Sequence, residues 1–386
     1  MSAALLPGAT IGVMGGGQLG RMLGQAARRL GYGFVVWSDE PAVPAVAVAD
    51  RLVRAPYDDA DAARAFAEAV DVVTLEFENV PAETAHMLEQ WRPVRPRPEV
   101  LWVAQHRGRE KEFLRSHGLP HVDYRDVADA LALRPALDAL GYPAVLKSAG
   151  SGYDGKGQLR LGARSDLAQG ERLAASGPCV LERFVPLALE VSVLVARAAD
   201  GSALTYPVFE NAHEKHVLDV SVVPARIDEA LAAHASQLAL RVAEALDLVG
   251  VACVECFVDD TGELLVNEIA PRPHNSAHLS IEACETDQFE QQLRAVCGLP
   301  LGATKLRSPA AMANLLGDLW SDGEPDWSAA LEVPGLHLHL YGKREARSGR
   351  KMGHMTMLAA DVDEAEAAVR AAREALTPTP SPPASG

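Results

Sequence analysis

The stretch that decides the fold of this chain reads Asn267-Glu268-Ile269-Ala270-Pro271-Arg272-Pro273-His274-Asn275-Ser276. Just upstream, residues 251–258 and 264–270 are apolar runs with one charge each, and residues 259–262 between them are a turn signal. Two such runs around a short polar turn predict a β-hairpin. Apolar residues on both faces of each run are typical of strands buried on two sides.

Two carboxylates are expected on one face of this hairpin. A loop of two or four residues pairs Glu255 with Val266, and side-chain alternation then places Glu268 diagonally across from Glu255 on the same side. Asn267 faces the opposite side in this simple pairing. A role for Asn267 beside the carboxylates therefore needs a bulge or the end of the strand.

The carboxylate pair indicates a metal site. Two carboxylates on an apolar hairpin repel each other and are costly to desolvate, whereas a divalent cation between them removes that cost. Oxygen ligands suit Mg²⁺, and the basic and polar residues 271–276 would lie where anions meet the metal. The pattern indicates a nucleotide site. The alternative is a solvated hairpin whose glutamates point to water, which the apolar residues on both faces disfavour.

Size and composition restrict the class of protein. The chain has 386 residues, enough for two or three domains, and its 48% hydrophobic and 23% charged residues are ordinary for a globular protein. The net charge of −16 argues against nucleic acid or an anionic membrane as a general partner, although a local basic pocket can still bind small anions. No apolar run is long enough for a membrane span, and no secretory signal is evident at the start.

The cysteines favour a reducing compartment. Five cysteines are an odd number, and most lie in apolar segments, so we expect buried free thiols in the cytoplasm. Cys253 and Cys256 have the CxxC spacing, but they fall within a predicted strand and lack the second pair that zinc needs.

The N-terminal region is expected to form an α/β unit. Residues 10–14, 34–37 and 71–77 are short apolar strands, and residues 19–30 have helical periodicity. Strands that alternate with helices predict a parallel, doubly wound, Rossmann-like sheet.

Composition divides the chain into four segments. A Pro/Arg-rich stretch at residues 92–98 ends the first, so we expect an N-terminal domain at residues 1–99. A second domain at residues 100–297 contains the hairpin, and a small third domain follows at residues 298–377. Residues 378–386 are Pro/Ser-rich and are expected to be disordered.

A glycine motif in the first domain leaves two interpretations open. Gly15, Gly17 and Gly20 follow a strand and precede a helix, and Asp39 lies at about the spacing of a dinucleotide fingerprint. Alone this motif predicts NAD or FAD binding. The same geometry also brings any phosphate or carbonyl group to a helix N-terminus, and many α/β proteins use it only as a turn.

Two further segments indicate phosphate binding. Residues 150–158 contain four glycines after a strand that ends in Lys147, and their backbone N–H groups can close over phosphates, although the loop is not a Walker A motif. Residues 343–354 are a basic segment in an acidic chain. Either segment alone is compatible with a solvated surface loop. His337 and His339 alternate on a predicted strand and are expected to be structural.

Together these motifs resemble the ATP-grasp superfamily, and in detail the N5-carboxyaminoimidazole ribonucleotide synthetase family of purine biosynthesis. The resemblance runs from Gly15-Gly16-Gly17-Gln18-Leu19-Gly20 to Gly349-Arg350-Lys351-Met352-Gly353-His354, nearly the whole chain. Tyr153-Asp154-Gly155-Lys156-Gly157-Gln158, Glu255-Cys256-Phe257 and Asn267-Glu268 occur between them in the family's order. The fold implied is α/β and α+β: an ATP-grasp domain between a Rossmann-like N-terminal domain and a small C-terminal domain that binds substrate phosphate.

The resemblance also implies which residues bind the nucleotide and its metal. Arg107 and Lys147 would contact the ATP phosphates, Glu182 and Val185 the adenine, and Glu190 the ribose. Glu255 and Glu268 would bind Mg²⁺, with Mn²⁺ as an alternative. The full set implied to contact ATP is Arg107, Lys147, Gly152, Tyr153, Asp154, Gly155, Lys156, Gly157, Gln158, Glu182, Arg183, Phe184, Val185, Glu190, His213, Asn267 and Glu268.

The remaining implied roles concern the other substrates. The residues implied to act on bicarbonate and the aminoimidazole are Tyr153, Asp154, Arg272, His274 and Asn275. Those implied to bind the ribonucleotide are Gln18, Glu78, Ser276, Lys343, Arg350 and Lys351, the last three of them at its 5′-phosphate.

The activity implied is an ATP-dependent carboxylation of 5-aminoimidazole ribonucleotide by bicarbonate through carboxyphosphate, in a cytoplasmic homodimer. Three alternatives stay open: an ATP-grasp ligase for another carboxylate such as formate or an amino acid, an NAD-dependent oxidoreductase, and a non-catalytic module. The basic residues 343–351 and the run 272–275 disfavour the first of these, whereas Lys147, Glu255 and Glu268 disfavour the last.

Overall fold

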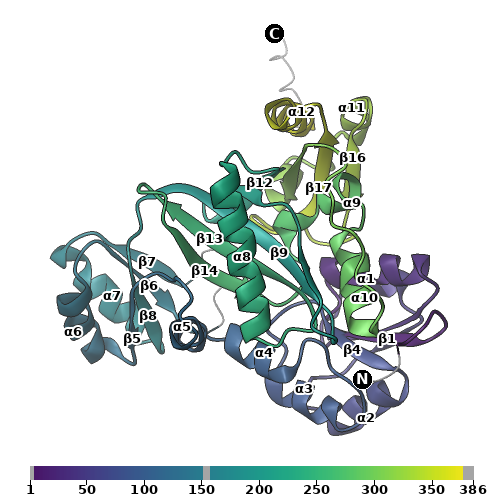
Figure 1. Ribbon diagram of the computed structural model, residues 1–386, viewed down its shortest axis with the longest axis horizontal. Helices are drawn as coiled ribbons and strands as arrows, with labels where there is room; N and C mark the ends of the chain where they lie inside the picture. The colour runs from purple at the N-terminus through teal and green to yellow at the C-terminus, as the bar shows by residue number, and fades with distance from the viewer. Residues whose placement is uncertain (1–3, 151–156, 377–386) are drawn as a thin grey trace, which may run out of the picture.

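The computed structural model describes residues 4–150 and 157–376, whose strands form three sheets (Figure 1). The N-terminal sheet is parallel with the order β3-β2-β1-β4, as predicted for a doubly wound unit. Its strands are β1 (Thr10–Met14), β2 (Gly33–Trp37), β3 (Arg51–Val53) and β4 (Val72–Leu75). Its helical segments are α1 (Gln18–Arg29), η1 (Pro44–Val48), α2 (Ala60–Glu68), α3 (Ala82–Glu89) and α4 (Pro98–Ala104).

Helices cover both faces of this sheet because each has one apolar stripe. In α1 the buried residues recur at helical spacing: Leu19, Met22, Leu23, Ala26 and Ala27. These residues share a core with Phe289, Leu293 and Val296 of α10 (Gln288–Cys297). The opposite face packs on α2 and α3. A helix from late in the chain thus joins the N-terminal unit to the rest of the molecule.

The second sheet is a small antiparallel unit with the order β5-β8-β6-β7, which lies at the left in Figure 1. Its strands are β5 (Tyr124–Val127), β6 (Ala144–Ser148), β7 (Gln158–Leu161) and β8 (Cys179–Arg183). One core buries α6 (Ala130–Leu140) against these strands, and α7 (Leu167–Ala174), preceded by η2 (Arg164–Asp166), packs beside it. Lys147 and Glu182 therefore lie on neighbouring strands of one sheet.

The third sheet has nine strands in the order β14-β13-β9-β11-β12-β15-β17-β16, with β10 paired to β9. It contains the predicted hairpin as β13 and β14, and it continues into the C-terminal region through the pairing of β12 with β15. Its strands are β9 (Leu187–Arg197), β10 (Ala203–Thr205), β11 (Phe209–Glu214), β12 (Val217–Val223), β13 (Gly250–Asp259), β14 (Leu264–Ala270), β15 (Ala310–Leu316), β16 (His337–Leu340) and β17 (Lys351–Leu358).

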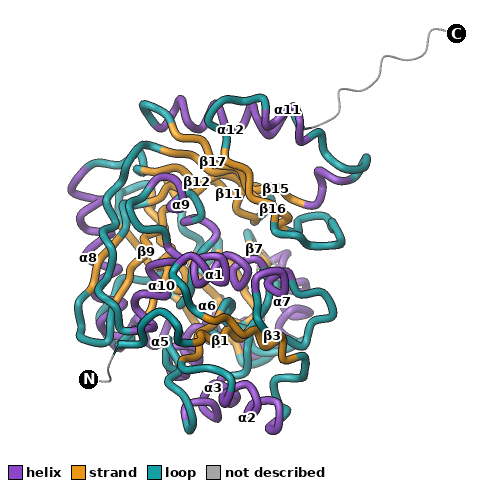
Figure 2. The backbone as a smooth tube through the Cα atoms, turned by 90° about the vertical axis from the view of Figure 1, so that its right-hand side faces the viewer, coloured by secondary structure: helices purple, strands orange, loops and turns teal. Residues whose placement is uncertain are grey.

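Helices complete this large unit. A charged helix, α5 (Arg107–Ser116), follows α4, and α8 (Glu229–Ala245), capped by the Asp228 side chain, packs on β9 and β13. The remaining helical segments are η3 (Asn275–Ala277), α9 (Ser280–Ala283), η4 (Gly317–Trp320), α11 (Trp327–Leu331) and α12 (Val362–Glu374). In the two views, α12 lies at the end of the molecule opposite α2 and α3 (Figure 2).

Within the described part of the chain, no helix is both long and apolar enough to cross a membrane. All five cysteines are buried free thiols, as the sequence predicted. The predicted disordered tail lies outside the described residues.

Candidate active site

The hairpin places Glu255 directly opposite Glu268, but not in the predicted register. Val258 pairs with Leu264, so residues 259–263 form an odd-numbered loop, and Cys256 rather than Glu255 pairs with Val266. The register then shifts between Glu255 and Cys256, which leaves Asn267 as a bulge and brings Glu268 opposite Glu255. The prediction of one shared face is confirmed, and the prediction of a diagonal pairing after an even-numbered loop is wrong.

Two residues of α5 satisfy the backbone that the bulge leaves unpaired. The Lys111 ammonium donates to the Asn267 carbonyl over 3.0 Å, and the Glu110 carboxylate accepts from the Ile269 N–H over 2.5 Å. Both side chains are buried. Because β14 is the edge strand of its sheet, these groups stand in for a missing neighbouring strand. The sequence did not predict the roles of Glu110 and Lys111. The one indication of burial is that Lys111 lies on the same face of α5 as the apolar Leu114.

Each carboxylate of the pair faces a basic side chain. His274 Nε2 lies 2.8 Å from Glu255 Oε1, and Arg107 Nη1 lies 3.3 Å from Glu268 Oε2. Burial alone would raise the pKa of Glu255, but His274, His213 and Arg272 outweigh it and lower that pKa to about 2. Burial opposes charge on His274, whereas Cys253 and Glu255 favour it and raise its pKa to about 10. Glu255 and His274 are therefore both charged at neutral pH.

A buried hydrogen-bonded chain holds the other edge of the His274 ring. Ser276 Oγ lies 2.9 Å from His274 Nδ1 and 2.9 Å from Ser192 Oγ, and Asn211 donates to Ser192 Oγ over 2.9 Å. Ser221 Oγ donates to Asn211 Oδ1 over 2.8 Å and ends the chain. Ser276 is fully buried and so supports His274 from behind rather than facing the cavity.

The second sheet and α5 together form a buried cluster of two cations and one acid, with Lys147 and Glu182 from the sheet and Lys111 from the helix. Lys147 Nζ lies 2.6 Å from Glu182 Oε2, and Lys111 Nζ lies 3.4 Å from Glu182 Oε1. Burial would raise the pKa of Glu182, but the two lysines outweigh it and lower the pKa to about 2. Lys147 also donates to Asn267 Oδ1 over 3.3 Å, which connects this cluster to the bulge.

These groups surround one cavity of about 470 Å³, a size suited to a nucleotide. The predicted residues that line it are Glu78, Arg107, Lys147, Gln158, Glu182, Arg183, Phe184, Val185, Glu190, His213, Glu255, Asn267, Glu268, Arg272, His274, Asn275 and Lys351. Residues that line it without having been predicted are Val145, Arg160, Leu187, His216, Leu218 and Phe257. Most of the latter are apolar strand residues that resemble ordinary core residues in sequence.

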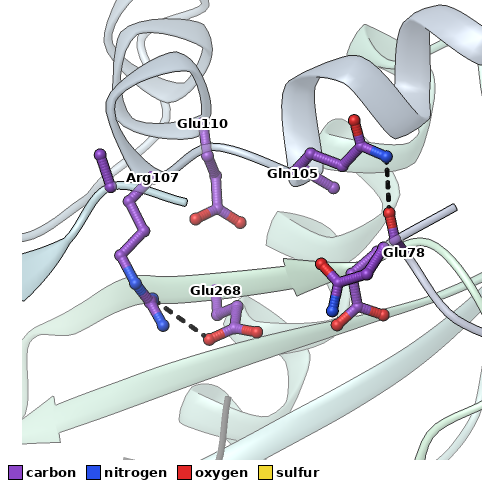
Figure 3. Close-up of a pocket in the computed structure, with 8 residues that line it drawn as sticks. Glu78, Gln105, Arg107, Glu110 and Glu268 are labelled. Carbon is purple, nitrogen blue, oxygen red and sulfur yellow. Dashed lines mark hydrogen bonds and ion pairs between the residues drawn. The ribbon is translucent and has the colours of Figure 1, made fainter. Parts of the chain in front are cut away.

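A smaller polar pocket of about 30 Å³ adjoins this cavity and shares Glu78, Arg107 and Glu268 with it. Figure 3 shows the Arg107 guanidinium directed to Glu268, and the Glu110 carboxylate pointing into the same space. Burial and the nearby Glu268 raise the pKa of Glu110 to about 8. Gln105 anchors the far wall by donating to the Glu78 carbonyl over 2.7 Å.

Arg272 connects the hairpin to the N-terminal unit. Its guanidinium makes a two-pronged ion pair with Glu78, one arm of which spans 2.9 Å from Nη2 to Oε1. Both side chains are largely buried. The pair therefore fixes Arg272 at the cavity wall, where β14 ends.

Other predicted residues lie away from the cavity lining. Lys343 Nζ donates to the Lys351 carbonyl over 2.7 Å, and burial together with Arg350 and Lys351 lowers its pKa to about 8. Gln18 opens α1, and the Gly157 carbonyl accepts from the Ser148 N–H over 2.7 Å. The predicted residues Gly152, Tyr153, Asp154, Gly155 and Lys156 lie outside the described residues.

The glycine motif of the first domain binds a side chain of the protein itself. The Glu76 carboxylate accepts from the Gly17 N–H over 2.5 Å and from the Gly20 N–H over 2.7 Å. A Cβ on Gly17 would lie only 2.7 Å from Glu76 Oε1, so glycine is needed for this close approach. An acid thus occupies the α1 N-terminus, where the NAD interpretation would place a pyrophosphate.

Comparison with known proteins assigns the class. Residues 112–289 match the family model of the ATP-grasp domain, and residues 8–105 match the ribonucleotide synthetase preATP-grasp domain. Residues 310–368 match the phosphoribosylaminoimidazole carboxylase C-terminal domain. The fold and the site together define an ATP-grasp ligase, which agrees with the predicted fold class.

The similarity extends to complete proteins. The N5-carboxyaminoimidazole ribonucleotide synthase of Bacillus subtilis (strain 168) is 42% identical over 360 residues, which cover 93% of this chain and 94% of that relative. The chain therefore belongs to the N5-carboxyaminoimidazole ribonucleotide synthetase family, whose members use ATP for a carboxylation step of purine biosynthesis. The predicted activity is confirmed, and the oxidoreductase, other-ligase and non-catalytic alternatives are excluded.

Solved structures agree with this assignment. A crystal structure of N5-carboxyaminoimidazole ribonucleotide synthetase as its ADP complex has a TM-score of 0.91 at 42% identity, and covers 96% of this chain and 98% of that one. The Aspergillus clavatus synthase in complex with ADP and 5-aminoimidazole ribonucleotide has a TM-score of 0.88 at 31% identity, and covers 96% of this chain and 99% of that one.

Proposed function

We propose that the large cavity binds MgATP between the second sheet and the hairpin, and holds bicarbonate and 5-aminoimidazole ribonucleotide on the side of Arg272 and Lys351. The observation that supports this most strongly is the pairing of Glu255 with Glu268 on the wall of a cavity that also exposes Lys147 and Arg107. Acids that bind a metal and cations that bind phosphates are what a nucleoside triphosphate needs.

On the nucleotide side, the predicted contacts are retained as proposals. Lys147 and Arg107 would bind the phosphates under the loop 152–158, with Gln158 at the end of that loop. The walls around the base and ribose would come from Glu182, Arg183, Phe184, Val185, Glu190 and His213, all of which line the cavity. His213 Nδ1 lies 3.2 Å from Glu190 Oε2, so the two residues would orient one another beside the ribose.

The donor set fits Mg²⁺, with Mn²⁺ as an alternative. Glu255 and Glu268 offer carboxylate oxygens, and the bulge brings Asn267 beside them. Both acids lie against basic side chains, so a cation can replace His274 and Arg107 at these oxygens and leave Arg107 for phosphate. The bound metal would neutralise charge on the triphosphate.

The carboxylation side follows from the same geometry. A bicarbonate oxygen attacks the γ-phosphorus of ATP, the bond to the β-phosphate oxygen breaks, and ADP leaves. The product is carboxyphosphate, whose carbon accepts the electron pair of the ribonucleotide amine as phosphate leaves and the amine loses a proton. Arg272, His274 and Asn275 would hold the carboxyl oxygens, together with Tyr153 and Asp154. Positioning and charge neutralisation account for most of the catalysis in such a transfer.

The ribonucleotide would be held by its two ends. Lys343, Arg350 and Lys351 would bind the 5′-phosphate, with Gln18 and Glu78 on the facing side and Ser276 behind His274. Lys351 lies on the cavity wall, and the Lys343 ammonium is bonded to its carbonyl, which supports a common phosphate site.

The wider setting is proposed from family membership. We expect a homodimer in the cytoplasm, where five free buried thiols stay reduced. We also retain domains at residues 1–99, 100–297 and 298–377; the three family models match residues 8–105, 112–289 and 310–368, so the first of them extends six residues past the boundary proposed at residue 99. Light scattering of the purified protein tests the dimer.

The proposal is tested with Glu268→Gln and a matched control on the same hairpin, Glu263→Gln, whose side chain is exposed in the turn. ADP formation is measured against MgCl₂ at saturating bicarbonate and ribonucleotide. Glu268→Gln should lower kcat about a hundredfold or more, since charge at the phosphates is left uncompensated, and Glu263→Gln should match the parent chain. Parent-like kinetics of a folded Glu268→Gln protein would refute the metal site.

A further inference from the structure

A buried histidine outside the cavity lining contacts the side chain of Asn275. The ring of His278 lies between those of Phe289 and His354, with centroids 5.8 Å and 4.7 Å away. Its Nδ1 lies 3.0 Å from Gln288 Nε2, and its Nε2 lies 3.1 Å from Asn275 Oδ1. The stack fixes the plane of the ring, and the two hydrogen bonds fix its rotation.

The orientation of the Gln288 amide is settled by the backbone of His274. Gln288 Oε1 accepts from the His274 N–H over 2.8 Å, and Gln288 Nε2 donates to the His274 carbonyl over 2.9 Å. A flipped amide would place donor against donor and acceptor against acceptor. The second hydrogen on Gln288 Nε2 therefore points to His278 Nδ1, which must accept.

This assignment settles the tautomer of His278. Burial, reinforced by His274 and His339, lowers the pKa of His278 well below its usual value, so the imidazole is neutral. A neutral ring that accepts at Nδ1 carries its single proton at Nε2. That proton is donated to Asn275, and the Asn275 carbonyl oxygen is the group that accepts it.

The tautomer of His278 determines which group of the Asn275 amide is free to bind a ligand. Asn275 lines the cavity. Within the described part of the chain its Nδ2 has no hydrogen-bond partner, and this atom is not among the fully buried polar atoms that lack one. Because Oδ1 is held by His278, the amide N–H₂ is the group left to face a ligand.

We propose that His278, set by Gln288, is a positioning residue that makes Asn275 present an N–H donor, and not its carbonyl, to the carboxyl oxygens that are transferred. The inference rests on the role proposed above for Asn275. A flipped amide would place its oxygen against these anionic oxygens and repel them. His278 touches no substrate and acts only through Asn275.

A double-mutant cycle in the full-length chain separates positioning from general structure. His278→Phe keeps an aromatic ring in the stack and removes the donor. Ribonucleotide-dependent kcat should fall about tenfold in His278→Phe and about a hundredfold in Asn275→Ala. If His278 acts through Asn275, the double variant should be no slower than Asn275→Ala. The KM for ATP should stay within about twofold, since the lost bond lies on the carboxylation side.

Two outcomes would count against these ideas in different ways. A double variant slowed about a thousandfold would show independent effects and overturn the positioning role. An Asn275→Ala protein at the parent rate would instead refute the role proposed for Asn275. The control is His337→Gln, which replaces an exposed histidine outside the ring stack and should leave kcat unchanged.

The tautomer can also be read without substitution. Long-range ¹H–¹⁵N NMR of histidine-labelled protein should show His278 as a neutral ring protonated at Nε2 between pH 6 and 8. This measurement decides the matter if His278→Phe does not fold. A ring protonated at Nδ1, or an imidazolium, would overturn the proposal.

Discussion

The Glu76 carboxylate accepts a hydrogen bond of 2.7 Å from the backbone N–H of Gly20, in the first turn of α1. In dinucleotide-binding proteins this glycine motif binds a pyrophosphate. Here it binds the side chain of Glu76, which follows strand β4. Burial raises the pKa of Glu76, whereas the Gly20 and Gly17 N–H groups at the positive end of the helix oppose that rise and favour the charged form. The motif is therefore a structural joint between α1 and β4.

Glu76→Gln should destabilise the fold without changing the affinity for ATP. The amide would set an N–H₂ group against one of the two glycine N–H groups, and we expect a loss of about 2 kcal/mol in the free energy of unfolding. Urea unfolding followed by circular dichroism measures it. Glu68→Gln, at an exposed pair with Arg64, should cost less than about 0.5 kcal/mol. Equal losses in the two variants would contradict this role for Glu76.

Lys111→Met should be among the more damaging changes to a lysine in this chain. It removes an ion pair of 3.4 Å with the buried Glu182, which then keeps only Lys147, and it removes the donor to the Asn267 carbonyl. We expect a loss of about 3 kcal/mol in unfolding free energy. The comparison is Lys305→Met at an exposed site, which should be close to neutral. A Lys111→Met protein as stable as that control would show that the bulge needs no such support.

The Glu255–His274 pair should make stability depend on pH. The pKa of Glu255 is lowered from 4.5 to about 2, so its contribution is present above pH 4.5 and is lost as the pH falls towards 2. The pKa of His274 is raised from 6.5 to about 10, so its contribution is present below pH 6.5 and is lost as the pH rises through 10. Both contributions are present in full only between pH 4.5 and pH 6.5.

His274→Gln should therefore cost most near pH 5.5, about 3 kcal/mol, and clearly less at pH 9.5. Unfolding curves of the parent chain and the variant at several pH values give the difference. His234→Gln, at an exposed site on α8, should show no such trend. A constant cost for His274→Gln from pH 5.5 to 9.5 would mean that the pair does not titrate as described.

Lys343 should make ribonucleotide binding sensitive to alkaline pH. Burial, Arg350 and Lys351 lower its pKa to about 8, so the free enzyme loses this cation as the pH rises through 8. The kcat/KM for the ribonucleotide should then decline above pH 8, while that for ATP should not. Lys343→Arg keeps the charge and should flatten the profile. An unchanged decline in Lys343→Arg would assign the titration to another group.

Much of the fold was predictable because the decisive signals are local. The apolar run at Thr10–Met14 has the bounds of β1, and the two runs around residues 259–262 form β13 and β14. Alternation placed Glu255 and Glu268 on one face only with an assumed even-numbered loop; in the structure an odd-numbered loop and the bulge at Asn267 together give the same shared face. What alternation cannot supply is the length of the loop and the presence of a bulge.

The unpredicted parts depend on residues far apart in sequence. The bulge at Asn267 is stabilised by Lys111 and Glu110, which lie more than 150 residues upstream. The sequence around residue 267 therefore does not predict these contacts. Phe257 and Leu218 line the cavity although their sequence context is that of core strand residues. Whether an apolar side chain faces a core or a ligand is decided by which sheet packs opposite it.

One continuous ladder of main-chain hydrogen bonds runs from β14 to β17, from the acid pair to Lys351. Each pair of neighbouring strands along this path is hydrogen-bonded, so the span between the acid pair and Lys351 is set by the spacing of the strands. The large sheet thus fixes how far the acid pair lies from Lys351.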